Sequence, residues 1–138
     1  MILLDTDTYT LHQRAHERVV ERCRTAKEVP SITIATQIEI LRGRYDDLFK
    51  AVDGDRVLRA QEVLAITLQH MAQFPVVPFD ASAVTEFDRL RGTKGLRRIG
   101  RGDLLIAAIA LANRATLVTR NSRDFRKVPG LQIENWAD

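Results

Sequence analysis

The chain has 138 residues, of which 45% are hydrophobic and 28% are charged, a composition typical of one globular domain spanning residues 1–138. Its single cysteine, Cys23, excludes a disulfide framework and a cysteine-based zinc site. The N-terminus lacks a signal-peptide pattern, and the longest apolar run, 104–112, is far shorter than the ~20 residues that span a bilayer. We therefore expect a cytoplasmic protein with no membrane segment.

The net charge of +3 is distributed unevenly along the chain. Residues 91–102 contain five bases and no acid, and residues 120–127 contain four bases and one acid. Such clustering predicts an anionic partner, most commonly a nucleic acid. For either cluster alone, a solvated face that keeps the protein in solution is the simpler explanation.

Short apolar and β-branched runs alternate with longer helical patterns along the whole chain. Strands are predicted at 2–4, 31–34, 75–78, 116–119 and 131–134. Helices are predicted near 15–26, 36–51, 56–74, 80–91 and 103–115, and the last of these is apolar on all sides. This alternation indicates an α/β fold with a mainly parallel sheet and helices on both faces. No repeat or linker indicates a domain boundary.

In a parallel sheet of this kind, ligands bind at the carboxyl ends of the strands. Asp5 and Asp7 follow the first strand, Glu39 lies in the first turn of the helix after the second, and Asn121 follows the fourth. Asp103 begins the helix before the fourth strand. We expect such a helix start at the opposite edge unless the preceding loop carries it across.

Each acidic residue also has a local explanation. Glu39 forms a capping-box pattern with Thr36, and Asp103 is a natural N-cap for an apolar helix. Asp5 could stabilise a turn, and Asp124 could pair with a neighbouring arginine.

A cluster of these carboxylates would outweigh the local explanations. If Asp5, Glu39 and Asp103 converge, each pair within ~4 Å repels by about 4 kcal/mol at an effective dielectric constant of about 20. A helix cap contributes only ~1 kcal/mol. The cluster must therefore hold protons or a cation, and oxygen ligands without nearby His or Cys favour Mg²⁺ or Mn²⁺ over zinc.

A divalent metal beside a basic, glycine-rich loop suits phosphodiester chemistry, because the ion activates water and neutralises charge on phosphate. The glycines of 95–102 would let the loop approach a nucleic-acid backbone closely. The residues expected to bind that backbone are Lys94, Arg97, Arg98, Arg101 and Arg120.

Four stretches, in this order and spacing, resemble PIN-domain proteins and in particular VapC-type toxin ribonucleases. They are LLDTD (3–7), TQIEILRG (36–43), GRGDLLIAAIAL (100–111) and LVTRNSRDFRKVPGLQIENW (117–136), and the resemblance covers nearly the whole chain. It implies a three-layer α/β/α sandwich and a Mg²⁺-dependent endoribonuclease of a type II toxin–antitoxin system, with Mn²⁺ as an alternative ion.

The resemblance carries the family's metal-binding carboxylates onto Asp5, Glu39 and Asp103. The family's further acidic position is occupied here by Asn121, with Asp124 three residues later. Either residue could fill this position in catalysis, or the site could work with three carboxylates.

Other implied features concern the surroundings of the site and the partners. Asp7 would orient the site, and the hydroxyls of Thr36 and Thr119 would support the metal ligands. Proteins of this kind cleave RNA, pair with a small VapB-like antitoxin whose C-terminal segment fills the active groove, and usually form homodimers. The apolar stripe on the helix at 36–51 could serve either partner, or it could simply be core.

Two other functions fit parts of the sequence. LLDTDT also resembles the start of haloacid-dehalogenase-type phosphatases, but Tyr9 and Ala107 stand where that pattern expects Thr or Val and an acid. A PIN-fold module that binds RNA or protein without catalysis is the second alternative, and Asn121 favours it. A DNA-binding regulator is disfavoured because no helix-turn-helix pattern is present.

Overall fold

The computed structural model describes all residues from Met1 to Asp138 as a five-stranded, wholly parallel sheet surrounded by helices. The sheet order is β3-β2-β1-β4-β5. The strands are β1 (Ile2–Leu4), β2 (Ser31–Thr33), β3 (Val76–Val77), β4 (Thr116–Val118) and β5 (Gln132–Glu134). The helices are α1 (Thr6–Gln13), α2 (Glu17–Thr25), α3 (Ile34–Lys50), α4 (Gly54–Met71), α5 (Ala81–Arg91), α6 (Arg101–Ala112) and α7 (Ser122–Phe125).

All five predicted strands and all five predicted helices are confirmed, with boundaries shifted by a few residues. Two helices were not predicted, α1 and α7. The α1 segment TDTYTLHQ has three threonines and no clear apolar face, so its sequence pattern does not indicate a helix. It begins because the Asp5 side chain caps it, accepting a hydrogen bond from the Thr8 amide at 2.8 Å.

Hydrophobic side chains pack on both faces of the sheet and produce the predicted three-layer α/β/α sandwich. Leu3 and Leu117 point to one face, where they pack in the same cluster as α6. Leu4 and Val118, their neighbours in β1 and β4, point to the other face and join the cluster that contains Tyr9. The predicted burial of the apolar helix is also confirmed, because residues 106–110 of α6 are fully buried.

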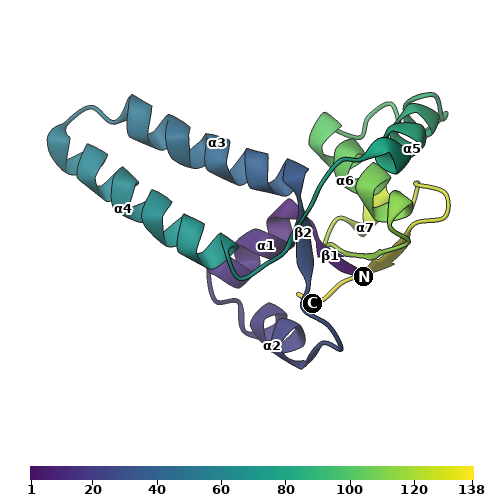
Figure 1. Ribbon diagram of the computed structural model, residues 1–138, viewed down its shortest axis with the longest axis horizontal. Helices are drawn as coiled ribbons and strands as arrows, with labels where there is room; N and C mark the ends of the chain where they lie inside the picture. The colour runs from purple at the N-terminus through teal and green to yellow at the C-terminus, as the bar shows by residue number, and fades with distance from the viewer.

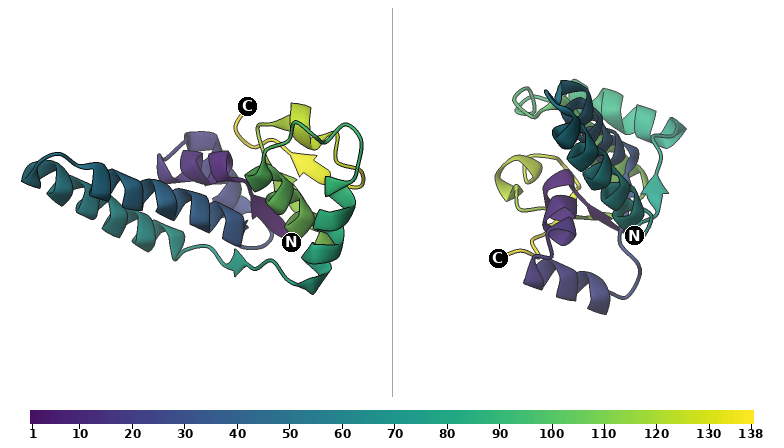
Figure 2. Two further views of the ribbon diagram at one scale, coloured as in Figure 1. Left: turned by 90° about the horizontal axis from the view of Figure 1, so that it is seen from above. Right: turned by 90° about the vertical axis from the view of Figure 1, so that its left-hand side faces the viewer.

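The α3 and α4 helices form a long antiparallel hairpin that projects away from the sheet (Figures 1 and 2). The base of the hairpin is anchored by buried residues, Ala35 and Thr36 in α3 and Thr67 and Met71 in α4. No residue between 37 and 66 is buried. None of the helices has both the length and the apolar character needed to cross a bilayer.

Candidate metal centre

Asp5 lies where β1 passes into α1, at the carboxyl edge of the sheet. Its side chain is buried, with 4% of its surface exposed. One carboxylate oxygen accepts a hydrogen bond from the Thr8 amide, and the other accepts one from the Thr119 hydroxyl at 2.6 Å. Each oxygen keeps a further lone pair, so these bonds orient the group without exhausting its capacity to bind a ligand.

Glu39 lies further into α3 than the sequence pattern suggested. The predicted capping box is wrong, because α3 begins at Ile34 and its N-cap is Thr33, whose hydroxyl accepts the Thr36 amide at 3.2 Å. Thr36 is therefore a buried residue of the first turn, and Glu39 lies beyond that turn. The Glu39 carboxylate does not cap the helix.

Asp103 is likewise not an N-cap. Gly100 occupies that position, without any side-chain cap, and Asp103 lies in the first turn of α6. The expectation that this helix start lies at the opposite edge is also wrong. A helix joining parallel strands runs antiparallel to them, so its N-terminus lies at their carboxyl edge. Gly102 accordingly packs against the Glu39 carboxylate.

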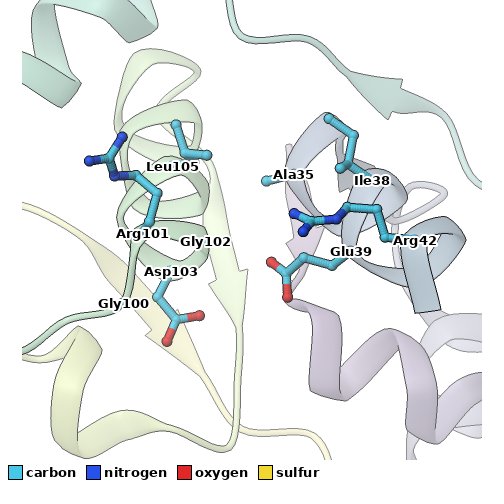
Figure 3. A pocket seen from close by; sticks show the side chains of 9 residues that line it. All are labelled: Ala35, Ile38, Glu39, Arg42, Gly100, Arg101, Gly102, Asp103 and Leu105. Atoms are coloured by element: carbon cyan, nitrogen blue, oxygen red, sulfur yellow. The ribbon is translucent and has the colours of Figure 1, made fainter. Parts of the chain in front are cut away.

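Glu39 and Asp103 face each other across a cleft between α3 and α6 with a volume of about 380 Å³. Figure 3 shows both carboxylates directed toward the space between the two helices. The remaining walls of the cleft are mixed in character, and its nine lining residues are Ala35, Ile38, Glu39, Arg42, Gly100, Arg101, Gly102, Asp103 and Leu105.

Each of the three carboxyl groups has a raised pKa. Burial raises the pKa of Asp5, against the opposing effect of its hydrogen bonds from Thr119 and Thr8. Burial followed by the charge of Asp103 raises the pKa of Glu39. Burial followed by the charges of Asp5 and Asp124 raises the pKa of Asp103. A cation at this edge would relieve the repulsion.

The carboxyl groups influence one another without forming a closed ligand cage. No three His, Cys, Asp or Glu side chains lie close enough together to hold one metal ion in common. The donors at the site are carboxylate oxygens, which suit the hard cations Mg²⁺ and Mn²⁺. The donor chemistry and the raised pKa values therefore fit a divalent ion.

Asn121 and Asp124 are hydrogen-bonded to each other, and the charge of Asp124 acts on Asp103. Asn121 is the N-cap of α7, and its side-chain amide donates to the Asp124 carboxylate at 3.0 Å. The Asn121 backbone amide donates to the Thr119 hydroxyl at 2.9 Å, and that hydroxyl donates to Asp5. Thr119 therefore links the α7 cap directly to the buried carboxylate.

Asp7 and Thr36 lie at the margins of the site. Asp7 is an exposed residue in the first turn of α1, 3.8 Å from the Arg120 guanidinium. The Thr36 hydroxyl is hydrogen-bonded to that of Thr6 at 3.0 Å. Asp7 thus contributes to a surface ion pair, while Thr36 lies behind the site between α1 and α3.

The basic residues expected to bind a nucleic acid lie at separate places on the protein. Arg101 lines the cleft, and its guanidinium lies 5.7 Å from the centre of the Phe87 ring. Arg97 and Arg98 line a different hollow, and Lys94 is exposed on the same loop. Arg120 is the residue that pairs with Asp7.

Arg42 was not singled out from the sequence, and Gly102 was expected only to let the loop approach a nucleic acid. Arg42 lines the cleft one turn after Glu39, and its positive charge partly offsets the raised pKa of that carboxyl group. A Cβ atom at Gly102 would displace the Glu39 carboxylate, because it would lie 3.2 Å from Glu39 Cδ and closer still to its Oε1. The spacing of Arg42 from Glu39 on one helix face was an available signal, whereas the contact at Gly102 requires the tertiary structure.

Comparison with known proteins shows similarity along the chain. Residues 2–131 match the PIN domain family. Ribonuclease VapC2 of Rickettsia felis is 41% identical over 69 residues, which are 48% of this chain and 51% of that protein, so the match spans about half of each. The tRNA(fMet)-specific endonuclease VapC of Salmonella typhimurium is 25% identical over 98% of this chain and 97% of its own.

Solved structures show the same fold. DNA-bound VapBC from Salmonella typhimurium superposes with a TM-score of 0.79 and 26% identity, covering 98% of this chain and 97% of that one. VapBC2 from Rickettsia felis, bound to a promoter DNA fragment, gives a TM-score of 0.75 and 27% identity over 99% of both chains. With its parallel sheet and the acidic edge formed by Asp5, Glu39 and Asp103, this chain belongs to the PIN-domain family.

Proposed function

We propose that this protein is a Mg²⁺-dependent endoribonuclease that hydrolyses RNA phosphodiester bonds and acts as the toxin of a toxin–antitoxin pair. The observation that carries the proposal is the group of three carboxyls, Asp5, Glu39 and Asp103, with raised pKa values at the carboxyl edge of a PIN-type sheet. Relatives named as ribonuclease and tRNA-specific endonuclease support it.

In this proposal the ion, Mg²⁺ or Mn²⁺, keeps several of its water molecules, and Asp5, Glu39 and Asp103 bind it directly or through those waters. A divalent ion held here lowers the pKa of a water molecule and offsets the charge that develops on the phosphate. Thr119 and the Thr8 amide keep the Asp5 carboxylate in one orientation. The N-terminus of α6 and the nearby arginines favour an anionic phosphate at the cleft.

Asn121 and Asp124 have supporting roles in this proposal. The Asn121 amide holds Asp124 at 3.0 Å, so Asp124 is the carboxylate available at the family's fourth acidic position. Asp124 also contributes to the raised pKa of Asp103, which places its charge within reach of the site.

We propose that this chain binds a small VapB-like antitoxin. We also propose that it forms a homodimer. The support is the nature of the structural neighbours, which include VapBC complexes from Salmonella typhimurium, Rickettsia felis and nontypeable Haemophilus influenzae.

The test is cleavage of a mixed pool of structured RNAs by the purified protein, with Mg²⁺, with Mn²⁺ and with a chelator. We expect metal-dependent cleavage that falls by at least about 100-fold in Asp5→Asn and in Asp103→Asn, because each variant loses a charged ligand of the metal ion. Asp46→Asn is the matched control, since Asp46 is exposed on α3 and forms no ion pair. Full activity in Asp103→Asn would refute the assignment of the metal site.

One observation favours a second candidate, a non-catalytic module that binds RNA or protein. The position expected to carry an acid holds Asn121, whose amide is engaged as a helix cap. Calorimetric titration with Mg²⁺ separates the two candidates, because a nuclease must bind the ion and a degenerate module need not. A folded protein that neither binds Mg²⁺ nor cleaves RNA would be this module.

A further inference from the structure

A second hollow, with a volume of about 320 Å³, lies outside the carboxylate cleft and is lined only by Gly95, Arg97, Arg98 and Lys127. None of its lining residues is acidic, and none of them lines the cleft that contains Glu39 and Asp103. Two segments far apart in the sequence form it, the α5–α6 loop and the turn after α7. The hollow is therefore a tertiary feature with purely positive charge.

The cations of this hollow have no partner within the protein. Arg97, Arg98 and Lys127 form no salt bridge and no side-chain hydrogen bond. Nearby arginines differ in this respect, since Arg89 binds Glu86 at 2.6 Å and Arg91 lies 3.8 Å from Asp88. The three charges are thus unneutralised and concentrated at one place.

Buried neighbours hold the backbone of the hollow in position. Leu96 and Ile99, on either side of the arginine pair, are only 4% and 8% exposed and belong to the main core. Lys127 lies between Phe125 and Val128, which are also buried in that core. The backbone that carries the three cations is therefore anchored, so little backbone entropy is lost when they bind a ligand.

The chemistry of the hollow suits a phosphate group. Guanidinium groups bind phosphate oxygens through paired N–H donors, and an ammonium group adds a compact positive charge. Gly95, with φ of 89°, provides a turn without a side chain, so the phosphate can approach the backbone.

The hollow is near the cleft along the chain. Arg98 precedes Asp103 by five residues, a separation of at most about 18 Å even if fully extended. At ~3.4 Å per nucleotide along one strand, about five nucleotides or fewer bridge the two places. One RNA chain can therefore occupy both.

We propose that Arg97, Arg98 and Lys127 form a subsite for a backbone phosphate of the RNA substrate, within a few nucleotides of the bond that is cleaved. The inference rests on the proposed function and adds to it a contact that lies outside the metal centre. It assigns Lys127, one of the four bases of the 120–127 cluster, a specific contact with the RNA backbone. Efficient cleavage would therefore require that the RNA extend a few nucleotides beyond the cleaved bond, on the side that reaches the hollow.

The test measures RNA binding without cleavage. A fluorescein-labelled oligouridylate of about 12 nucleotides, within the usual site size for single strands, is titrated with protein in chelator at several salt concentrations. The variants are the double substitution Arg97→Ala with Arg98→Ala, and Lys127→Ala alone. The matched control is Lys50→Ala with Arg59→Ala, which removes two exposed, unpaired cations from the α3–α4 hairpin.

We expect the Arg97/Arg98 double variant to bind about 10-fold more weakly, and its salt slope to fall by about 0.7 for the one lost phosphate contact. Lys127→Ala should show a smaller loss of the same kind, and the hairpin control less than about a twofold change. Thermal unfolding of each variant checks that the fold is intact. Equal weakening by the hairpin control and the hollow variants would overturn the subsite, because binding would then depend on net charge alone.

A parallel assay of RNA cleavage in Mg²⁺ separates this inference from the proposed function. If the wild-type protein cleaves RNA while the hollow variants bind the oligonucleotide as tightly as wild type, the subsite is refuted and the nuclease stands. If the wild-type protein neither cleaves nor binds RNA, the proposed function fails and the subsite fails with it.

Discussion

Thr119 shows how one hydroxyl can organise an acidic site. It donates to the buried Asp5 carboxylate and accepts from the Asn121 amide, so it connects β4, α1 and α7 at one point. The residue is 1% exposed, which leaves no water to replace either bond. The geometry of Asp5 therefore depends on this contact.

Thr119→Val should destabilise the protein by about 1–3 kcal/mol, because it leaves the buried Asp5 oxygen and the Asn121 amide without their partner. Thr119→Ser keeps the hydroxyl and loses only a methyl group, so it should retain most of the stability. Urea unfolding at neutral pH provides the comparison. Equal free energies of unfolding for the two variants would contradict the role of the hydroxyl.

Gly102 controls the position of Glu39 by having no side chain. The three atoms nearest to a Cβ atom at this position all belong to the Glu39 carboxylate, which is the flexible end of a side chain. Gly102→Ala should therefore leave the fold as stable as before, or up to about 1 kcal/mol more stable, because alanine is the better helix former. The same substitution should weaken Mg²⁺ binding by about 10-fold or more, as measured by calorimetric titration.

Gly43→Ala is the control for this substitution. Gly43 lies in α3, and an added Cβ atom there would have no neighbouring atom within 4 Å, so alanine should stabilise the helix without affecting the ion. If both alanine variants bind Mg²⁺ like the wild type, Glu39 is not a ligand.

At the scale of whole elements, a chain of polar contacts fastens the hairpin to α1. Tyr9 and His70 are hydrogen-bonded at 3.0 Å, and His70 contacts His12 at 2.8 Å through their ring nitrogens. Gln13 and Arg44 both donate to the buried Thr67 hydroxyl nearby. The base of the hairpin is therefore held by directional contacts as well as by apolar packing.

The histidine pair makes this junction sensitive to pH. Burial lowers the pKa of His12, and burial followed by the neighbouring His12 lowers that of His70. The unfolded chain binds protons more readily than the folded one as pH falls. The stabilisation from the neutral pair is thus complete above the ordinary histidine pKa of about 6.5 and is lost below it.

His12→Gln should reduce this pH dependence. We expect the wild-type free energy of unfolding to fall more steeply than that of the variant between about pH 7.5 and pH 5.5, on either side of the histidine pKa. Urea titrations at both pH values measure the difference. Parallel pH profiles for the two proteins would show that the pair does not act as a unit.

Across the whole molecule, the strands and the position of the site could be predicted, because they depend on local patterns of residue type. The strands were found because Leu3, Leu4, Leu117 and Val118 lie in short apolar runs, and parallel topology then placed Asp5 at a ligand-binding edge. These inferences use residue type and order, which the sequence contains directly.

Other features depend on contacts that the sequence does not specify. The starts of α3 and α6 were misplaced because Thr33 and Gly100 also make acceptable N-caps, and the choice between candidates is tertiary. Val63 and Ile66 of α4 have helical spacing typical of a buried face, yet they are 43% and 60% exposed. Periodicity identifies an apolar face but not what covers it.

Stability should also be uneven along the projecting hairpin. Because no residue from 37 to 66 is buried, little apolar surface is exposed when the far end of the hairpin opens. Amide hydrogen exchange should therefore be faster in residues 44–62 than at the base of α4 near Thr67, as measured by mass spectrometry. Uniform protection along both helices would contradict this expectation.

The projecting hairpin also affects how long the free protein survives. A protease needs a locally opened segment, and the end of the hairpin supplies one without unfolding the sheet. Phe49 and Val52 lie at this end, and their side chains are 85% and 77% exposed. A partner there would protect the chain from degradation, so its presence would set the lifetime of the protein.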